Sequence, residues 1–398
     1  MTRLNIDDRR ERAIVTVADL ALGPVGAARR LRASPPAALP GRILCLRLER
    51  IGDLLMAAPA ITHLRALAPS ASIDLVVGSW NAAVARAIPG VTRVDTLDAA
   101  WLARETAGLR LPALLKAARG WRDRPYDLAI NFEPDIRTNL LLAASGARRL
   151  AGFSSGGGGP LLDVSLEYDV LAHTTDNDLS LVMAAVNGSA PAATNVTLDI
   201  PDAARAEAAR LLAPVSAPLR VGVHAGGGRA IKQWPESRLG EVARRLMVDR
   251  RAALVLTGSD DDREHTDLVK RELPAGQILD LTGRVDLLTL AAVIHELDIF
   301  ITGDTGPMHL ASAVGTPIVA VFGPSDPIRY GPRGSRDRVV RVDLPCSPCN
   351  RIRLPPARCM GHTPDCLVQV TASQVLDAVL EVLATREQTD ARVRSARV

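Results

Sequence analysis

The chain has 398 residues, a length that predicts two domains rather than one. Hydrophobic residues make up 47% and charged residues 23%, a balance that excludes general disorder. The net charge of +4 at pH 7 suits an anionic ligand or membrane surface without requiring one. Because aromatic residues are only 3%, few rings are available to stack on bases, and we expect no nucleic-acid partner.

The sequence shows neither a membrane-spanning run nor a targeting signal. No apolar stretch is long enough to form a transmembrane helix. The first eight residues carry acidic side chains and lack the apolar core that follows the basic start of a secretory signal. We therefore expect a cytoplasmic protein.

Residues 1–40 are expected to form an N-terminal extension. Its apolar stretch at 14–22 precedes Arg29, Arg30 and Arg32, and a Pro-rich segment follows. A helix that ends in such a basic cluster can rest on anionic lipid, which would make the protein peripheral to the inner membrane. The alternative, which the sequence favours, is a solvated helix with a Pro-rich linker.

Strands alternate with helices from residue 42 onward. The predicted strands and helices of the first half are, in chain order, 43–46, 54–68 with Pro59 as a kink, 73–78, 111–122 and 128–131. The run of four glycines at 156–159 is expected to be a flexible loop. This alternation predicts a parallel, doubly wound sheet.

A second α/β pattern follows a Pro- and Ala-rich connection at 191–218. Predicted strands cover 219–224, 253–257, 298–302 and 317–322, and predicted helices cover 236–247, 260–272, 287–296, 305–314 and 373–385. We expect α/β domains at 41–205 and 206–385, with a flexible tail at 386–398. Ligands of such sheets bind beyond the carboxyl ends of the strands, which favours the cleft between two domains.

The most informative motif joins a predicted strand to a helix and reads T-G-D-T-G-P-M-H. The N–H groups of Thr305 and Gly306, with the helix dipole, predict a diphosphate site, and Pro307 fits the first helical turn. Asp304 repels phosphate and suits a ligand hydroxyl or amine, whereas His309 can donate to a phosphate or sugar oxygen. An ordinary helix cap explains the motif equally well when it is taken alone.

A second glycine-rich turn follows the first predicted strand of the second domain. Gly226 and Gly227 let backbone N–H groups approach an anion, and Lys232, in K-Q-W-P, supplies a charge for a leaving diphosphate. Two such turns in one domain support each other. An acidic run that includes Asp262 either accepts hydrogen bonds from ribose hydroxyls or only begins a helix.

The turn at 47–53 stands where the first sheet would bind a ligand. It lacks the G-x-G-x-x-G spacing, which argues against a nicotinamide or flavin cofactor. Asp53 is a candidate general base, and Arg50 is a candidate contact for an acidic acceptor. Capping of the following helix is the other role for Asp53, and the local sequence alone favours it.

Four of the five cysteines lie in one C-terminal segment at 346–366. Cys346 and Cys349 form C-x2-C, and Cys359 and Cys366 follow. Thiols with this clustering are able to bind a structural zinc or iron ion. Free thiols in a reduced loop are the alternative, which the sequence favours.

Together these segments resemble glycosyltransferase family 9, the ADP-heptose:lipopolysaccharide heptosyltransferases. The resemblance covers roughly residues 42–383, and the block 304–327 is its most specific part. The supporting pieces are 43–53 with Pro59, 232–235, 258–262 and 281–283. The family implies a GT-B fold, in which two Rossmann-like domains face each other across a cleft, with the acceptor on the first and the donor on the second.

The resemblance further implies an inverting transfer that requires no cofactor. Asp53 would take the proton from the acceptor hydroxyl, while Lys232 and the amides of the T-G-P turn would stabilise departing ADP. Arg50 and Arg137 are assigned to the acceptor. The residues assigned to the donor are Gly226, Gly227, Asp262, Thr282, Asp304, Thr305, Gly306, Pro307 and His309. The implied partners are an ADP-sugar, the lipopolysaccharide core and the inner face of the cytoplasmic membrane.

Two features depart from the family pattern. The first phosphate turn reads A-G-G-G where relatives often carry hydroxyl residues, and the N-terminal extension lies outside the family pattern. Some relatives have a comparable cysteine group, including an iron-binding version among autotransporter heptosyltransferases. The alternatives are another nucleotide sugar or a protein acceptor, a non-catalytic sugar-nucleotide binding protein, and a non-hydrolysing epimerase; the presence of both Asp53 and Lys232 favours an enzyme.

Overall fold

The computed structural model describes residues 4–6, 8–32, 39–103, 108–191 and 198–395. The chain divides into two compact units, Met1–Asp199 and Ile200–Val398. The division lies before helix α7 (Asp202–Leu212), whereas the expected boundary after residue 205 falls inside it. Helix α7 packs against helix α10 (Leu287–His295) of the second unit, so its residues belong there.

The first unit is built on one parallel sheet with the strand order β3-β2-β1-β4-β5-β6. Its strands are β1 (Arg42–Arg47), β2 (Ser72–Val77), β3 (Arg93–Thr96), β4 (Leu128–Asn131), β5 (Arg149–Phe153) and β6 (Val164–Leu166). This is the strand order of the doubly wound Rossmann fold. The predicted strands correspond to β1, β2 and β4, whose buried apolar residues made them recognisable.

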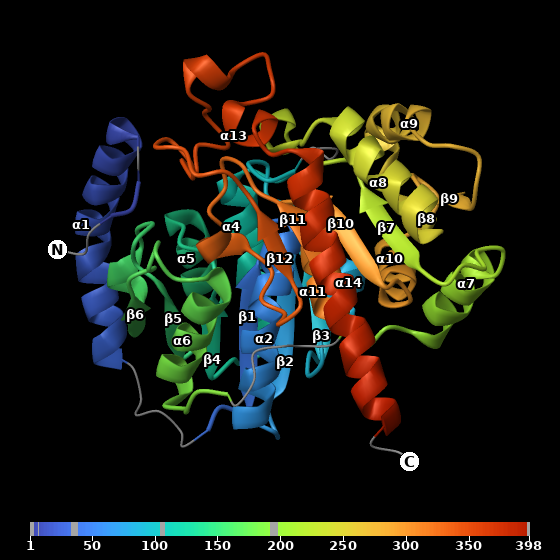
Figure 1. Ribbon diagram of the computed structural model, residues 1–398. Helices are drawn as coiled ribbons and strands as arrows, with labels where there is room; N and C mark the ends of the chain where they lie inside the picture. Colours follow the sequence, from blue (N-terminus) through green and yellow to red (C-terminus); the bar gives the residue numbers. More distant parts are fainter. Residues whose placement is uncertain (1–3, 7, 33–38, 104–107, 192–197, 396–398) are drawn as a thin grey trace. The chain divides into compact units, whose positions relative to one another are not determined.

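Helices cover both faces of this sheet (Figure 1). They are α1 (Arg9–Arg32), α2 (Ile51–Leu67), α3 (Ala82–Arg86), α4 (Leu111–Arg119), α5 (Ile136–Ala144) and α6 (Thr174–Val186). Helix α2 continues through Pro59 and packs against α6. Between strands and helices lie the short 3-10 turns Ser79–Asn81, Gly120–Asp123 and Gly159–Leu161.

Helix α1 is docked on the first unit by one of its faces. Val15 is buried, and the side chain of Asp19 accepts a hydrogen bond of 2.6 Å from the N–H of Gly158. Arg29 forms an ion pair with Asp163. The glycine run, expected as a flexible loop, is a close-packed turn, because a Cβ on Gly157 would lie 2.3 Å from Val15. The extension therefore contains an ordered, docked helix, and the Pro-rich segment 33–38 lies outside the described residues.

The second unit repeats the same topology with the order β12-β11-β10-β7-β8-β9, again parallel throughout. Its strands are β7 (Arg220–His224), β8 (Ala253–Thr257), β9 (Ile278–Asp280), β10 (Ile299–Gly303), β11 (Ile318–Val321) and β12 (Arg338–Val340). Its further helices are α8 (Glu236–Arg250), α9 (Arg263–Arg271), α10 (Leu287–His295), α11 (Gly306–Val314), α12 (Pro327–Tyr330), α13 (Asp365–Val368) and α14 (Ala372–Ser395). Three short 3-10 turns of this unit are Ala230–Lys232, Asp260–Asp262 and Ala357–Cys359.

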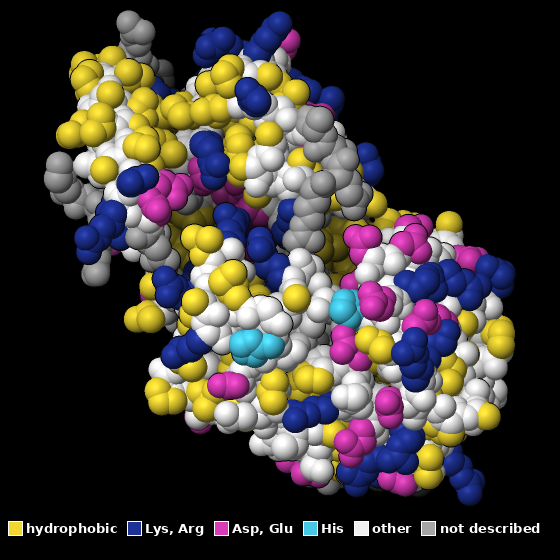
Figure 2. Space-filling model, turned by 90° about the horizontal axis from the view of Figure 1, so that it is seen from above, with side chains coloured by type: hydrophobic (Ala, Val, Ile, Leu, Met, Phe, Trp, Pro, Cys, Tyr) yellow, Lys and Arg dark blue, Asp and Glu magenta, His cyan; other side chains and the backbone are white. Residues whose placement is uncertain are grey.

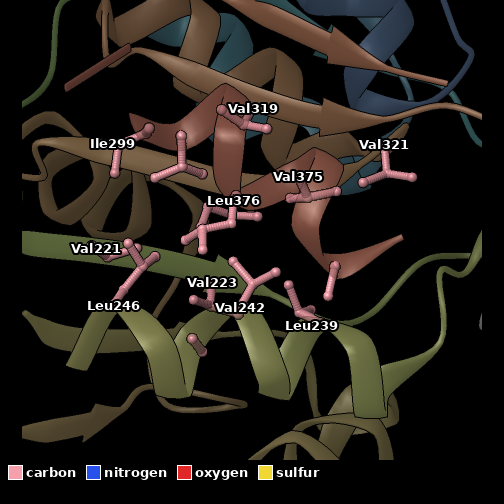
Figure 3. Close-up of a cluster of buried hydrophobic side chains, with 14 of the residues drawn as sticks. Val221, Val223, Leu239, Val242, Leu246, Ile299, Val319, Val321, Val375 and Leu376 are labelled. Atoms are coloured by element: carbon pink, nitrogen blue, oxygen red, sulfur yellow. The ribbon is translucent and has the colours of Figure 1, made fainter. Parts of the chain in front are cut away.

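Helices α8 and α14 cover one face of the second sheet with a continuous apolar core (Figure 3). Leu239, Val242 and Leu246 recur on one side of α8 and point at Val221 and Val223 of β7. Their spacing of three and four residues is that of a helix with one buried face. This packing fixes β7, and with it the loop that follows its carboxyl end.

Each sheet has a point where the strand order reverses, between β1 and β4 in the first unit and between β7 and β10 in the second. Ligands of doubly wound sheets bind outside the carboxyl ends of the strands at such a point. The two Rossmann-like units confirm the predicted α/β fold class. Among the described residues, no helix has the length and apolar character needed to cross a membrane.

Candidate active site

The loop after β7 and the loop after β10 meet in an ion pair. The ammonium nitrogen of Lys232 lies 2.8 Å from Oδ2 of Asp304, and only 21% and 10% of the two side chains are exposed. Burial opposes ionisation of Asp304, but Lys232, a hydrogen bond from Ser325 and the charge of His309 outweigh it and lower the pKa of Asp304. The pair is therefore ionised, and Asp304 holds the ammonium group at the switch point.

The N-terminus of α11 lies directly beside this pair in the chain. Thr305 is its N-cap residue, and Gly306 and Pro307 form its first turn. The Thr305 side chain makes no capping hydrogen bond; its hydroxyl lies 3.0 Å from that of Thr302. The ordinary side-chain cap considered for this motif is thus not formed, and the first-turn amides keep the orientation that binds anions at helix N-termini.

The glycine-rich turn packs between Asp262 and α11. The N–H of Gly227 donates to Oδ1 of Asp262 over 3.2 Å, and a Cβ on Gly227 would lie 3.5 Å from the methyl group of Thr305. A Cβ on Gly226 would lie 2.0 Å from Oδ1 of Asp262, so only glycine fits there. The two anion-suited turns predicted from the sequence therefore lie together.

Asp262 and Thr282 support this turn. The second oxygen of Asp262 accepts hydrogen bonds from the backbone and hydroxyl of Ser259. Burial raises the pKa of Asp262, but these bonds, His224 and Gly227 outweigh burial and lower it. Thr282 is fully buried, and its hydroxyl donates to Thr266 over 3.1 Å. Thr282 thus supports the site through a buried hydrogen bond.

Other residues of the second unit were not singled out from the sequence. In the K-Q-W-P segment, Gln233 donates to the carbonyl of Gly227 over 2.9 Å, and Trp234 is buried with its ring N–H on the carbonyl of Val370. Only Lys232 of this segment reaches Asp304. Ser325, which hydrogen-bonds Asp304, stands in the F-G-P-S-D-P segment, but no local signal showed that it would meet Asp304.

In the first unit, a buried arginine gathers carboxylates at the end of β1. Nη2 of Arg47 lies 3.9 Å from Oδ1 of Asp53, and Nη1 lies 3.5 Å from Glu49. The side chain of Arg47 is only 2% exposed. Burial would lower the pKa of Arg47, but Asp178 and the neighbouring carboxylates outweigh burial and raise it, so the guanidinium stays charged.

Asp53 contacts both the start of α2 and the guanidinium of Arg47. Its Oδ2 accepts the backbone N–H of Arg50 over 3.1 Å, which caps the first turn of α2, while Oδ1 faces Arg47. The side chain is 29% exposed, so it remains accessible. A carboxylate with one oxygen in the helix cap and the other beside a guanidinium has a fixed orientation, as a general base requires.

Two buried acids close this cluster, and the sequence analysis missed both. Burial raises the pKa of Asp178 to about 7, although Arg47 opposes the shift. Burial and Glu49 likewise raise the pKa of Glu133, whose side chain accepts hydrogen bonds from the backbone of Leu48 and Glu49. Glu133 follows β4 at the switch point and was recognisable by that place. Asp178 sits within α6, where nothing local marks it.

Arg50 and Arg137, assigned to the acceptor, both stack on indole rings. The guanidinium carbon of Arg50 lies 5.4 Å from the ring centre of Trp80, and that of Arg137 lies 4.3 Å from the ring centre of Trp101. Arg137 also pairs with Asp135 at 2.5 Å. Asp135 accepts hydrogen bonds from Nε and Nη2 of Arg137, and the carbonyl of Leu102 accepts one from Nη2 of Arg50.

The structural zinc or iron ion at the cysteine segment stays a prediction. All four cysteines are free thiols, with Cys346 exposed and Cys366 buried. Burial raises the pKa of Cys366 to about 11, with smaller effects from the other three thiols. In the described part of the chain, which includes this whole segment, no three His, Cys, Asp or Glu side chains are arranged to hold a metal ion.

Comparison with known proteins connects these features to one family. The family model for glycosyltransferase family 9 (heptosyltransferase) matches residues 114–356. Lipopolysaccharide heptosyltransferase 1 of Pseudomonas aeruginosa is 26% identical over 321 residues, which cover 77% of this chain and 86% of that protein.

Solved structures agree in fold. The ADP-heptose lipopolysaccharide heptosyltransferase II of E. coli has a TM-score of 0.71 at 21% identity, covering 87% of this chain and 99% of that one. The glycosyl transferase family 9 protein of Veillonella parvula has a TM-score of 0.76 at 24% identity, covering 89% and 100%. Two parallel six-stranded sheets in the same order are the architecture of the GT-B fold, as predicted.

Proposed function

The chain belongs to glycosyltransferase family 9 (heptosyltransferase), and from this premise we propose that it transfers a heptose from ADP-heptose to a hydroxyl of the lipopolysaccharide inner core. The names of the relatives in Pseudomonas aeruginosa and E. coli support both the sugar and the acceptor class. The observation that carries the proposal is the meeting of Lys232, Asp304 and the α11 N-terminus at one switch point.

The second unit is proposed to bind the donor. The amides of Thr305 and Gly306 and the ammonium of Lys232 would face the diphosphate, whose negative charge grows as the bond to the sugar breaks. Asp304 positions Lys232, which is a different task from the ligand contact expected of it. The nucleoside would lie along the glycine turn that Asp262 supports.

The first unit is proposed to bind the acceptor. Asp53 would take the proton of the attacking hydroxyl, with Arg47 holding the carboxylate in place. Arg50 and Arg137 would contact acidic groups of the inner core. Attack from the side opposite the departing ADP inverts the anomeric centre, and the positive groups of the donor unit replace a metal ion in stabilising the leaving group.

The donor is tested by a thermal-shift comparison of ADP, UDP and GDP, followed by a transfer assay with ADP-heptose. At equal concentration, the nucleotide that binds the folded state most tightly stabilises it most, so ADP should raise Tm most. Equal shifts by the three nucleotides, or a larger shift by UDP or GDP, would contradict the proposed donor.

The role of Lys232 is tested with Lys232→Ala. Transfer should fall by about a hundredfold to a thousandfold because the leaving diphosphate loses its charged partner. The matched control is Lys270→Ala, which removes a lysine paired with Asp280 over 3.0 Å on the same unit and should leave transfer close to wild type. Equal losses in the two variants would refute the assignment.

A further inference from the structure

Helix α1 presents an apolar face that the other described residues of its unit leave exposed. From residue 13 to residue 28, every residue of the helix that is exposed is apolar. The larger ones are Ile14, Val17, Leu20 and Val25, with exposed fractions of 70%, 66%, 61% and 55%, and Leu31 follows at 88%. Soluble proteins rarely leave such a continuous apolar strip in water without a partner for it.

The opposite face of the same helix is fully used. Val15 is buried, Gly26 lies against the carbonyl of Pro160, and Arg30 donates to that carbonyl over 2.9 Å. Asp19 and Arg29 fix the helix at two further points, as described above. The apolar strip therefore faces away from the first unit and cannot be hidden by turning the helix about its axis.

The net charge of the chain equals the net charge of this helix. Six arginines stand against Glu11 and Asp19 within α1, which gives +4, and the formal charge of the whole chain is also +4. The remaining residues therefore sum to zero. Exposed arginines flank the strip at both ends, with Arg9, Arg10 and Arg12 before it and Arg30 after it. Figure 2 shows hydrophobic side chains gathered at the left, on the side where α1 lies in Figure 1.

We propose that α1 is an interfacial helix that lies flat on an anionic lipid bilayer. The strip would enter the boundary between headgroups and acyl chains, and the flanking arginines would contact lipid phosphates. Residues 13–28 span about 24 Å of helix, less than the hydrocarbon core of about 30 Å, and the other face is docked, so α1 lies on the membrane without crossing it.

Charge favours a bilayer over a second copy of the chain. Because arginines stand at both ends of the strip, two copies packed strip to strip would bring like charges together in either orientation. An anionic surface instead meets both ends with opposite charge. The inference rests on the proposed function only in that a membrane-borne acceptor gives the helix a reason to be there.

The test is co-sedimentation with vesicles of equal parts phosphatidylethanolamine and phosphatidylglycerol. Val17→Glu/Val25→Glu should lower the bound fraction more than about tenfold, because two apolar side chains no longer enter the lipid and two negative charges are added. The control is Val248→Glu/Ile328→Glu, which changes side chains of similar exposure, 59% and 65%, outside α1 and should bind like the wild type.

Binding of the wild type should also weaken on phosphatidylcholine vesicles and in high salt, because both reduce the attraction of the arginines. Unchanged sedimentation of the α1 variant would overturn the proposal. So would a dimer in analytical ultracentrifugation that the α1 variant abolishes while vesicle binding stays the same.

Two transfer assays separate this inference from the proposed function. With a water-soluble core oligosaccharide, the α1 variant should transfer heptose at the wild-type rate; with the acceptor in vesicles, it should be slower. No transfer by the wild type to either acceptor would refute the function and leave the vesicle result standing. Equal wild-type and variant rates on vesicles, with equal binding, would refute the role of α1 alone.

Discussion

The carboxylate of Asp53 does two things at once. One oxygen caps α2 through the N–H of Arg50, and the other lies beside the guanidinium of Arg47. The local sequence favoured Asp53 as the N-cap residue, but α2 begins earlier than predicted, with Arg50 as its N-cap residue and Asp53 at the third helical position. The hydrogen bond from Arg50 orients the carboxylate without excluding a role as a base. A cap and a base differ in what they need, because the cap needs only an acceptor oxygen whereas the base needs a proton-accepting charge.

Asp53→Asn separates these two needs. The amide oxygen still accepts from the N–H of Arg50, so the melting temperature should change little, whereas transfer should fall by about a hundredfold to ten-thousandfold. The control is Asp286→Asn, which alters a carboxylate that caps α10 through Leu288 and Thr289. Transfer that survives in Asp53→Asn as it does in the control would remove Asp53 from the mechanism.

Asp178 predicts a dependence of stability on pH. Neither carboxylate oxygen has a hydrogen-bond partner among the described residues, and burial raises the pKa to about 7. In the folded protein this group keeps its proton up to that pH, whereas in the unfolded chain it loses the proton near pH 4. The folded state thus binds more protons between these values, and the free energy of unfolding should fall as pH rises from about 4 to about 7.

Asp178→Asn cannot titrate and should lack this part of the decline. Urea unfolding at about pH 5 and about pH 8 should show the stability of the variant rising relative to that of the wild type at the higher pH, by about 2–3 kcal/mol. An identical pH dependence in the two proteins would show that Asp178 ionises in the folded state as it does in water.

At the scale of elements, the glycine-rich turn depends on its lack of side chains. A methyl group on Gly226 would lie 2.0 Å from Oδ1 of Asp262, so Asp262 must move and its hydrogen bond from Gly227 is lost. Gly226→Ala should cost about 1–3 kcal/mol of stability and weaken ADP binding. Gly120→Ala, where no atom lies within 4 Å of the added Cβ, should leave both unchanged. Chemical denaturation and ADP titration check the result, and unaltered ADP affinity in Gly226→Ala would count against the turn as part of the donor site.

Burial along the strands explains much of what the sequence predicts of the fold, although β5 was not predicted and is buried at four of its five residues. β8 and β11 are buried over their whole length and were recognisable as short apolar runs. β3, β9 and β12 stand at the edges of their sheets, are only half buried, and carry no such run. A strand that is half exposed on an edge needs fewer apolar residues, so its sequence resembles a loop.

The residues of the candidate site also divide into those that the sequence predicted and those that it missed. Asp53, Lys232 and Asp304 follow central strands, so the rule for carboxyl ends was enough to select them. Arg47 and Asp178 are both buried and interact by their charges. Asp178 comes from α6, far along the chain from Arg47. Which side chain of an amphipathic helix meets a strand end is set by packing, which a single sequence does not display.

At the scale of the whole molecule, one topology serves twice. Both units have the Rossmann strand order, and each places charged side chains at its own switch point. The proposed leaving-group contacts are a lysine and helix amides, which need no metal ion. Transfer should therefore survive saturating EDTA, with added magnesium changing the rate little. Strict dependence on a divalent cation, restored by adding it back, would contradict this mechanism.

The arginines of α1 also act on the molecule before any contact is made. Since the other residues carry no net charge between them, the net charge of the chain equals the charge of this helix, and we expect this asymmetry to give the chain an electric moment. In the field of a negatively charged surface such a moment produces a torque that turns the helix toward the surface. The protein would thus approach already oriented over distances of about 10 Å at physiological ionic strength, and tumble at random in concentrated salt.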